Sequence, residues 1–350
     1  MKTARSVLLH GALLSGFAAL TMRSLRLEMG PATVVYAALG LLSLGTLPFA
    51  LRKRRGRVYY SVTNALILAL LIPAILSAAL YESFFFRRFE TPSASLGSVR
   101  DYPGLLAEES PFPTDHGRRL AGVLYRREGE AKAVAVLAHG YGTGHRGYLG
   151  VVDALARAGY VVFAYDATAC DASPGRSARG LPQAAIDLEA ALDHVATLPD
   201  VSALPLVLIG HSWGGYAVGC AAEMPRVRAV ISLAGFDRST DIIRAQGQRL
   251  IGGAIEALLP CLSLYERLKF GARADMTAAA GFEKSAARVL IVHSADDATV
   301  PIVLGLDRYE AAFSGDPRFT FLRLEGRGHE NLFTSRDAQD YIAFFDEALS

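Results

Sequence analysis

Two long uncharged stretches near the N-terminus are the features that most constrain how this chain can fold. The first has 23 residues between Glu28 and Arg52, and the second has 24 residues between Arg57 and Glu82. At about 1.5 Å per residue, a helix of either length crosses a hydrocarbon core of about 30 Å. Neither stretch shows the polar face of a water-exposed helix. We therefore expect membrane-spanning helices over residues 30–51 and 58–81.

A shorter apolar stretch at residues 6–22 precedes these two. It follows Lys2 and Arg5, so it also resembles a signal peptide, but no convincing small-residue cleavage site comes after it. We expect an uncleaved third span and leave the signal peptide open. The sequence thus predicts a membrane region over residues 1–90 with two or three transmembrane helices.

The charge distribution divides the chain at the same place. Residues 1–90 contain 11 Lys and Arg against 3 Asp and Glu, a net charge of +8, and residues 91–350 carry a net charge of −6. The loop 52–57 has five basic residues, and short basic loops stay in the cytoplasm. We therefore expect an integral membrane protein whose C-terminal domain is extracytoplasmic. That acidic domain lacks the basic stripe of nucleic-acid-binding proteins.

From about residue 100 onward, short apolar runs alternate with helical segments, which is typical of β/α units around a mostly parallel sheet. Residues 238–287 exceed an ordinary connection between strands, so we expect an inserted lid there. The predicted strands are 133–138, 160–165, 204–209, 229–233, 289–292 and 319–324, and the predicted helices are 150–158, 182–198, 213–223 and 338–349.

The segment Gly210-His-Ser-Trp-Gly214 fits the pattern G-x-S-x-G. In this pattern, a sharp turn from a strand to a helix exposes a serine hydroxyl, and small residues allow the tight backbone. The pattern is weak alone, because this chain contains 33 glycines. Here it lies between a predicted strand and a predicted helix, so Ser212 is a candidate nucleophile.

A serine nucleophile needs a base, an acid that orients the base, and donors for the developing oxyanion. Asp297 and His329 each follow a predicted strand, and the order Ser, Asp, His along the chain is the order of one class of catalytic triad. Asp296 competes with Asp297, and Asp237 is a more distant rival. The predicted oxyanion donors are the backbone N–H groups of Tyr141 and Trp213.

These residues resemble the motifs of the α/β-hydrolase superfamily over residues 100–350. The motifs are His139-Gly140, Gly210 to Gly215, Asp297-x-x-Val300-Pro301 and Gly328-His329. The chain looks most similar to bacterial serine hydrolases near monoacylglycerol lipases, serine aminopeptidases and prolyl-oligopeptidase-type domains.

The resemblance implies an α/β-hydrolase domain over residues 91–350, with a mostly parallel sheet flanked by helices and a lid insertion. It also implies Ser212 as nucleophile, His329 as general base and Asp297 as the orienting acid. A bacterial cytoplasmic membrane is the expected location. The loop Asp166 to Gly175 lacks glycines that many relatives carry, which leaves one wall of the pocket open to question.

A second motif needs a separate explanation. Gly142-Thr-Gly144-His-Arg-Gly147 matches the dinucleotide fingerprint G-x-G-x-x-G, and Asp166 follows at a suitable distance. The hydrolase interpretation explains the same residues and also Ser212, so we expect no cofactor. We also expect no metal site, because the three cysteines lack zinc-site spacing.

The sequence therefore predicts a membrane-anchored serine hydrolase that cleaves an acyl ester, thioester or amide through an acyl-enzyme on Ser212. Its substrate would be a small molecule, a lipid or a peptide. A serine peptidase with the same triad is the first alternative, with Glu256 or Glu266 of the lid holding a peptide amino terminus. A non-catalytic membrane binding protein on the same scaffold is the second. The oligomeric state stays open.

Overall fold

The computed structural model describes residues 72–114, 117–333 and 335–350. The predicted spans 6–22 and 30–51 lie outside the described residues, as does the predicted span 58–81 up to residue 71. Residues 72–85 are helical. Within the described ranges, no helix combines the length and the apolar character needed to cross a membrane. The three spans stay predictions.

The chain divides into two compact units. The first unit comprises the residues up to Arg87 together with Arg244–Ala274, and the second comprises Arg88–Ile243 and Asp275–Ser350. The central part of the predicted lid therefore groups with the N-terminal residues, and both ends of the predicted lid group with the second unit.

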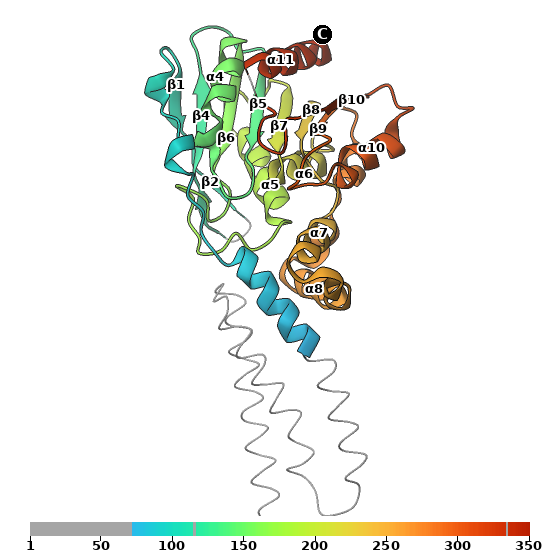
Figure 1. The fold of residues 1–350 in the computed structure, drawn as a ribbon. Helices are drawn as coiled ribbons and strands as arrows, with labels where there is room; N and C mark the ends of the chain where they lie inside the picture. The colour runs from blue at the N-terminus through green and yellow to red at the C-terminus, as the bar shows by residue number, and fades with distance from the viewer. Residues whose placement is uncertain (1–71, 115–116, 334) are drawn as a thin grey trace, which may run out of the picture. The chain divides into compact units, whose positions relative to one another are not determined.

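An eight-stranded sheet forms the centre of the second unit (Figure 1). Six strands are parallel, and β4 and β1 add an antiparallel edge beside β6. The sequence did not predict β1 or β4. All four residues of β1 are exposed and two of them are glutamates, so β1 has no buried apolar run. In sheet order, the strands are β1 (Leu106–Glu109), β4 (Gly122–Arg126), β6 (Tyr160–Tyr165), β5 (Ala133–Ala138), β7 (Leu206–His211), β8 (Val227–Leu233), β9 (Arg288–Ser294) and β10 (Phe319–Leu324). A separate pair is formed by β2 (Phe112–Pro113) and β3 (Arg119–Leu120).

Helices cover both faces of the sheet (Figure 1). On one face, α4 and α11 pack over alternate residues of the central strands, among them Ala135, Val162 and Ile209. On the other face, α6 packs between α5 and α9. The α-helices are α4 (Leu149–Arg157), α5 (Gln183–Val195), α6 (Trp213–Cys220), α7 (Ser239–Ile251), α8 (Ile255–Phe270), α9 (Ala278–Lys284), α10 (Leu306–Phe313) and α11 (Ser335–Leu349). The short 3₁₀ helices are η1 (Ser93–Ser95), η2 (Val99–Asp101), η3 (His145–Tyr148), η4 (Gly252–Ala254), η5 (Gly271–Asp275) and η6 (Ile302–Leu304).

The predicted lid contains three helices with different partners. Helix α9 packs closely on α6, and a Cβ on Gly281 would lie only 2.2 Å from the Gly219 carbonyl oxygen. This contact makes α9 part of the layer that covers the sheet. The first unit contains α8 and the C-terminal part of α7.

Candidate active site

Ser212 lies on a sharp turn between β7 and α6. Its backbone has φ +56° and ψ −112°, a conformation that residues other than glycine rarely adopt. Two glycines allow this turn. A Cβ on Gly214 would lie 2.0 Å from the Ala138 carbonyl oxygen, and one on Gly210 would lie 2.2 Å from the Gly214 carbonyl oxygen. The predicted turn is therefore present, with the serine held at its tip.

The structure brings the predicted serine, histidine and aspartate together. His329 Nε2 lies 2.8 Å from Ser212 Oγ, and His329 Nδ1 lies 2.7 Å from Asp297 Oδ2. An ionised carboxylate can only accept hydrogen bonds, so Nδ1 donates to it. In the neutral ring, Nε2 then accepts the serine proton. This geometry is what a general base needs in order to activate a hydroxyl.

Asp297, and not Asp296, is the acid in contact with His329. Its other oxygen, Oδ1, accepts the N–H groups of Thr299 at 2.8 Å and Val300 at 2.9 Å. Burial raises the pKa of Asp297, but hydrogen bonds from His293 and His329 outweigh burial and hold that pKa below its usual value. The carboxylate is therefore negative at neutral pH, as the orienting role requires.

Asp296 has a different position, at the surface of the same loop. Its Oδ1 accepts the Ser294 hydroxyl at 2.5 Å and the Gly328 N–H at 3.3 Å. It therefore links the end of β9 to the segment that carries His329. Asp237, the more distant rival, pairs with Arg308 at 3.1 Å and accepts the N–H of Ala279.

The predicted oxyanion donors belong to residues beside the nucleophile. Trp213 begins α6, where the first N–H groups of a helix have no partner within the helix. Its indole N–H donates to the Leu181 carbonyl oxygen at 2.8 Å, and its ring packs edge-on against Tyr141. Tyr141 lines the same cavity as Ser212. Their role as donors stays a prediction.

His139 holds the loop that contains Tyr141. His139 Nε2 accepts the Ala167 N–H at 2.8 Å, and His139 Nδ1 lies 2.8 Å from the Gly140 carbonyl oxygen. A carbonyl only accepts, so the proton of His139 lies on Nδ1 and the ring is neutral. Burial lowers the pKa of His139, which agrees with this protonation state.

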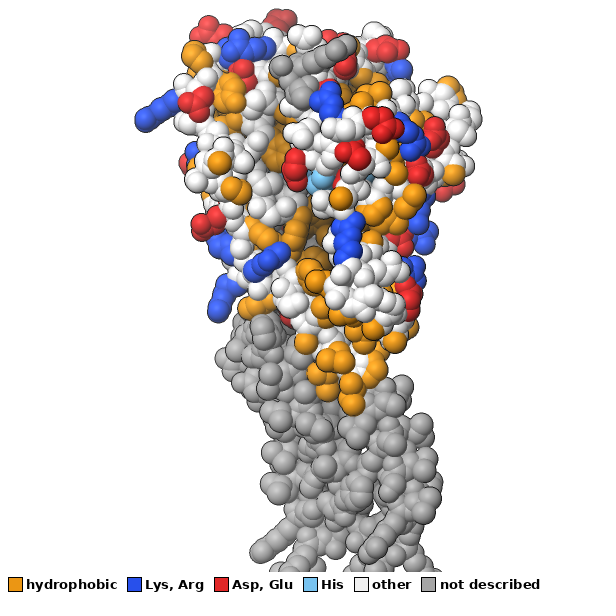
Figure 2. Space-filling model, in the orientation of Figure 1, with side chains coloured by type: hydrophobic (Ala, Val, Ile, Leu, Met, Phe, Trp, Pro, Cys, Tyr) orange, Lys and Arg blue, Asp and Glu red, His pale blue; other side chains and the backbone are white. Residues whose placement is uncertain are grey.

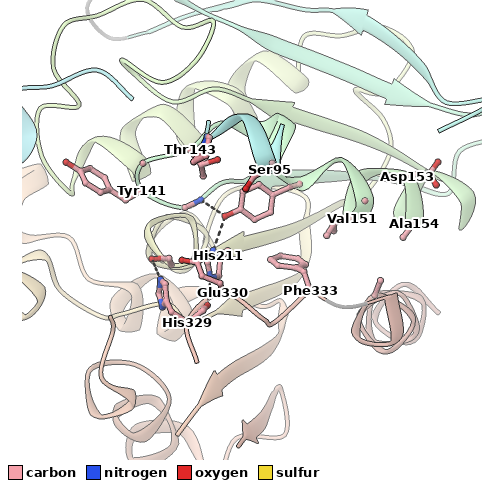
Figure 3. Close-up of a pocket in the computed structure, with 18 of the residues that line it drawn as sticks. Ser95, Tyr141, Thr143, Val151, Asp153, Ala154, His211, His329, Glu330 and Phe333 are labelled. Carbon is pink, nitrogen blue, oxygen red and sulfur yellow. Dashed lines mark hydrogen bonds between the residues drawn. The ribbon is translucent and has the colours of Figure 1, made fainter. Parts of the chain in front are cut away.

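His211 connects the loop that contains Tyr141 to the segment of His329. Its Nε2 lies 2.8 Å from the His329 carbonyl oxygen, and its Nδ1 lies 2.9 Å from the Tyr148 hydroxyl, which also accepts the Gly140 N–H at 3.0 Å (Figure 3). Burial, followed by the charge of His329, lowers the pKa of His211 to about 4. The sequence motif contains His211 but assigns it no role. No motif pointed to Tyr148.

The low pKa of His211 makes folding sensitive to acid. The unfolded ring takes up a proton near pH 6.5, whereas the folded ring stays neutral down to about pH 4. Stability is therefore full above pH 6.5 and is lost as the pH falls through this window, because the unfolded state binds more protons. We expect this histidine to remove about 2 kcal/mol of unfolding free energy between pH 7 and pH 5.

Denaturant unfolding of the detergent-solubilised protein at pH 7, 6 and 5 measures this loss. His211→Gln should unfold more easily at pH 7 and show a shallower decline with acid. An identical slope in both proteins would contradict the assignment.

Residues of the dinucleotide-like motif have structural partners. Asp166 Oδ1 accepts both the N–H and the Nδ1 proton of His145, at 2.9 and 2.7 Å, and Oδ2 accepts the Ala172 N–H at 3.1 Å. A Cβ on Gly144 would come within 2.5 Å of Asp166 Oδ1. The glycine and the carboxylate therefore serve close packing. His145 is buried as well.

A cavity of about 860 Å³ opens at Ser212 and lies entirely within the second unit. Figure 3 shows His211 and His329 on one side, Val151 and Ala154 of α4 on the other, and Phe333 between them. The cavity is lined by Pro92, Ser95, Gly140, Tyr141, Gly142, Thr143, Gly147, Tyr148, Gly150, Val151, Asp153, Ala154, Arg157, His211, Ser212, His329, Glu330, Phe333 and Ala338.

Hydrogen bonds tie the segment that supplies Pro92 and Ser95 to the loop that follows β5. Thr91 donates its N–H and its hydroxyl to the Asp171 carboxylate, at 2.6 and 2.7 Å, and its hydroxyl oxygen accepts the Gly144 N–H at 2.7 Å. This wall of the cavity therefore depends on the loop 166–175. In the sequence, this loop lacks glycines that many α/β-hydrolases similar to this chain carry.

Residues 129–279 match a protein family described as serine aminopeptidase, S33. The matched part contains Tyr141, Ser212 and Trp213 and ends before Asp297 and His329. A comparison with curated proteins found no match.

Solved structures are also similar to this chain. An esterase from Pyrococcus furiosus has a TM-score of 0.59 at 13% identity, covering 75% of this chain and 100% of the esterase. An acylaminoacyl peptidase from Pyrococcus horikoshii has a TM-score of 0.53 at 16% identity, covering 72% of this chain and 43% of the peptidase. An alpha/beta hydrolase from a Penicillium species has a TM-score of 0.52 at 18% identity, covering 70% and 98%. These likenesses confirm the predicted α/β-hydrolase fold.

Proposed function

We propose that this chain, a serine hydrolase with the α/β-hydrolase fold, cleaves a carboxylic ester, thioester or amide through an acyl-enzyme on Ser212. The observation that carries the proposal is the hydrogen-bonded series from Ser212 through His329 to the buried Asp297. The matched family and structures are described as hydrolases and peptidases, so they do not favour a non-catalytic scaffold.

The reaction follows from the positions of these groups. Ser212 Oγ attacks the substrate carbonyl carbon while its proton moves to His329 Nε2, and Asp297 stabilises the resulting imidazolium. The N–H groups of Tyr141 and Trp213 would bind the oxyanion. The bond to the leaving group then breaks, and the leaving group takes the proton from Nε2. Water repeats the sequence, which releases the acid and restores the serine.

The cavity wall favours an apolar acyl group. Val151 and Ala154 of α4 and the nearby Phe333 line the cavity, and all three are apolar. The two charged residues of α4 in this wall, Asp153 and Arg157, pair with each other at 2.7 Å, and Asp153 also pairs with Arg127 at 2.6 Å. We therefore infer esters or thioesters of apolar acids as the first substrate class to examine.

A peptidase is the second candidate, and one residue favours it. Glu330 follows His329 directly, is exposed, and lines the cavity, where it could bind a substrate ammonium group. The lid carboxylates considered from the sequence already have partners, because Glu256 pairs with Arg244 at 3.2 Å and Glu266 is buried and accepts the Tyr81 hydroxyl at 2.8 Å. Glu330 therefore replaces the lid carboxylates as the candidate that binds the substrate ammonium group.

Glu330→Gln separates the two candidates. If the enzyme cleaves aminoacyl amides, removing the charge should raise KM for these substrates about tenfold and leave neutral esters unaffected, because an ammonium group loses its ionic partner. Steady-state kinetics with a matched pair of aminoacyl amide and acyl ester measures this. Glu325→Gln, at another exposed position, is the control. Ester turnover that is high in both variants, with no amide turnover, would contradict the peptidase.

We further propose that residues 1–90 anchor the protein in a bacterial cytoplasmic membrane, with the hydrolase domain on the extracytoplasmic side. Two uncharged stretches of 23 and 24 residues support the anchor, and the basic loop 52–57 between them supports the orientation. Substrates dissolved in or attached to the membrane would then be available to the enzyme.

A further inference from the structure

Helix α8 is apolar on two opposite sides. Ile255, Leu259 and Leu262 are buried, as expected for a helix that packs on a core. The opposite side is also apolar, and there Leu264 is 58% exposed and Leu268 is 69% exposed. They lie four residues apart, so they are neighbours on the same face of the helix. Packing within the first unit therefore explains only one of the two sides.

The end of α7 and the turn that follows it are also exposed and mostly apolar. The sequence Leu250-Ile-Gly-Gly-Ala254 is exposed throughout, with Leu250 at 59% and Ile251 at 41%. Figure 2 shows hydrophobic side chains gathered on the surface of this region. We call Leu250, Ile251, Leu264 and Leu268 the apolar patch. Exposed apolar side chains that gather on one surface mark an interaction site.

Four hydrogen bonds hold α8 against helix 72–85 within the first unit. The Ser77 hydroxyl donates to the Leu258 carbonyl oxygen at 3.1 Å. Further along both helices, the Tyr81 hydroxyl donates to Glu266 at 2.8 Å. Glu82 is buried and accepts the Lys269 ammonium at 2.6 Å and the Tyr265 hydroxyl at 2.8 Å.

These contacts fix the level of α8 relative to the predicted third span. Ser77 and Tyr81 fall within the last turns of the predicted span 58–81, so α8 lies beside those turns. Ser77 is four residues before the end of this span, which is about 6 Å along a helix. A helix at this level would meet the interface between lipid headgroups and acyl chains.

The charge of this segment also suits a membrane surface. Residues 244–274 contain five Arg and Lys against two Glu, a net charge of +3, within a domain whose net charge is −6. Arg249 directly precedes Leu250, and Arg267 lies between Leu264 and Leu268. Basic residues beside exposed leucines are typical of helices that lie in the plane of an anionic membrane.

We propose that α8 and the preceding turn form a second membrane contact, in which the apolar patch enters the bilayer interface and the basic residues meet anionic headgroups. This contact does not span the membrane. It rests on the membrane anchor proposed above. It would hold the insertion between β8 and β9 at the lipid surface.

The test uses the full-length protein in vesicles of phosphatidylcholine and phosphatidylglycerol. Cys170 and Cys220 are buried, so Cys261→Ser removes the most accessible native thiol. Single variants Leu250→Cys, Leu264→Cys, Leu76→Cys and Leu322→Cys are then labelled with an environment-sensitive fluorophore. Leu76 is exposed on helix 72–85 and reports the anchor, and Leu322 is an exposed leucine of β10 that serves as the control. Fluorophosphonate labelling of Ser212 verifies that each variant is folded.

Lipids with a nitroxide near the headgroup should quench the labels at 250, 264 and 76 several-fold more strongly than the label at 322. Omitting phosphatidylglycerol should weaken quenching at 250 and 264. Quenching at 76 without quenching at 250 and 264 would overturn this inference and leave the anchor intact. Quenching at 250 and 264 alone would support the contact and reject the anchor. Labels at 264 that form excimers without lipid quenching would assign the patch to a second copy of the chain and overturn the lipid contact.

Discussion

Ser212→Ala should abolish hydrolysis, with a loss of at least about 10⁴-fold in kcat, because no acyl-enzyme can form without the hydroxyl. The alanine removes only one oxygen atom from a turn that Gly210 and Gly214 still allow, so the fold should remain. The measurement is turnover of a series of acyl esters, together with covalent labelling by a fluorophosphonate, which reacts only with an activated serine.

Ser314→Ala is the matched control, because Ser314 is an exposed serine outside the cavity. It should retain both turnover and labelling. Labelling of Ser212→Ala at the level of the native protein would mean that another residue is the nucleophile.

A fluorophosphonate that cannot cross the inner membrane tests the proposed orientation. It should label intact cells with a permeabilised outer layer as strongly as lysates, because the domain is expected outside the cytoplasm. Labelling that needs lysis would reverse the proposed orientation.

Asp297→Asn should lower kcat by about 10⁴-fold, the scale known for the same change in serine proteases. The amide would favour the wrong tautomer of His329, because its NH₂ group donates where the carboxylate accepted. KM should change little, since Asp297 is buried behind the histidine and does not line the cavity. Steady-state kinetics at pH 7 to 9 measures both constants.

Asp296→Asn is the neighbouring control for this change. Its oxygen accepts the Ser294 hydroxyl and the Gly328 N–H, and an amide oxygen can still accept both. We expect a change of less than about tenfold, because His329 keeps its carboxylate partner. A larger loss in Asp296→Asn than in Asp297→Asn would reassign the acid.

Local sequence was sufficient for several strands of the second unit. The strands Ala133–Ala138, Tyr160–Tyr165 and Phe319–Leu324 have the predicted bounds. The first two are short, fully buried apolar runs, which are typical of the central strands of a parallel sheet. The antiparallel strand Leu106–Glu109 was missed, because its exposed polar residues carry no such pattern.

The residues of the candidate site were predictable only where a local motif marks them. Ser212 was visible because Gly210 and Gly214, two positions before and after it, complete the motif G-x-S-x-G. The choice between Asp296 and Asp297 depended on which carboxylate turns toward a histidine more than 30 positions away. Tyr148 and Glu330 gave no signal, since their importance comes only from what they contact or line.

The sequence by itself determined the apolar N-terminal stretches, the β/α alternation and the order of serine, acid and base, because composition and spacing along the chain encode these features directly. The tertiary structure alone decided the partner of His329, the bridge through His211, the cavity along α4 and the exposed second face of α8. These features depend on distances between segments far apart in the sequence. Such distances are set by how helices and strands pack, and no local pattern of residues records them.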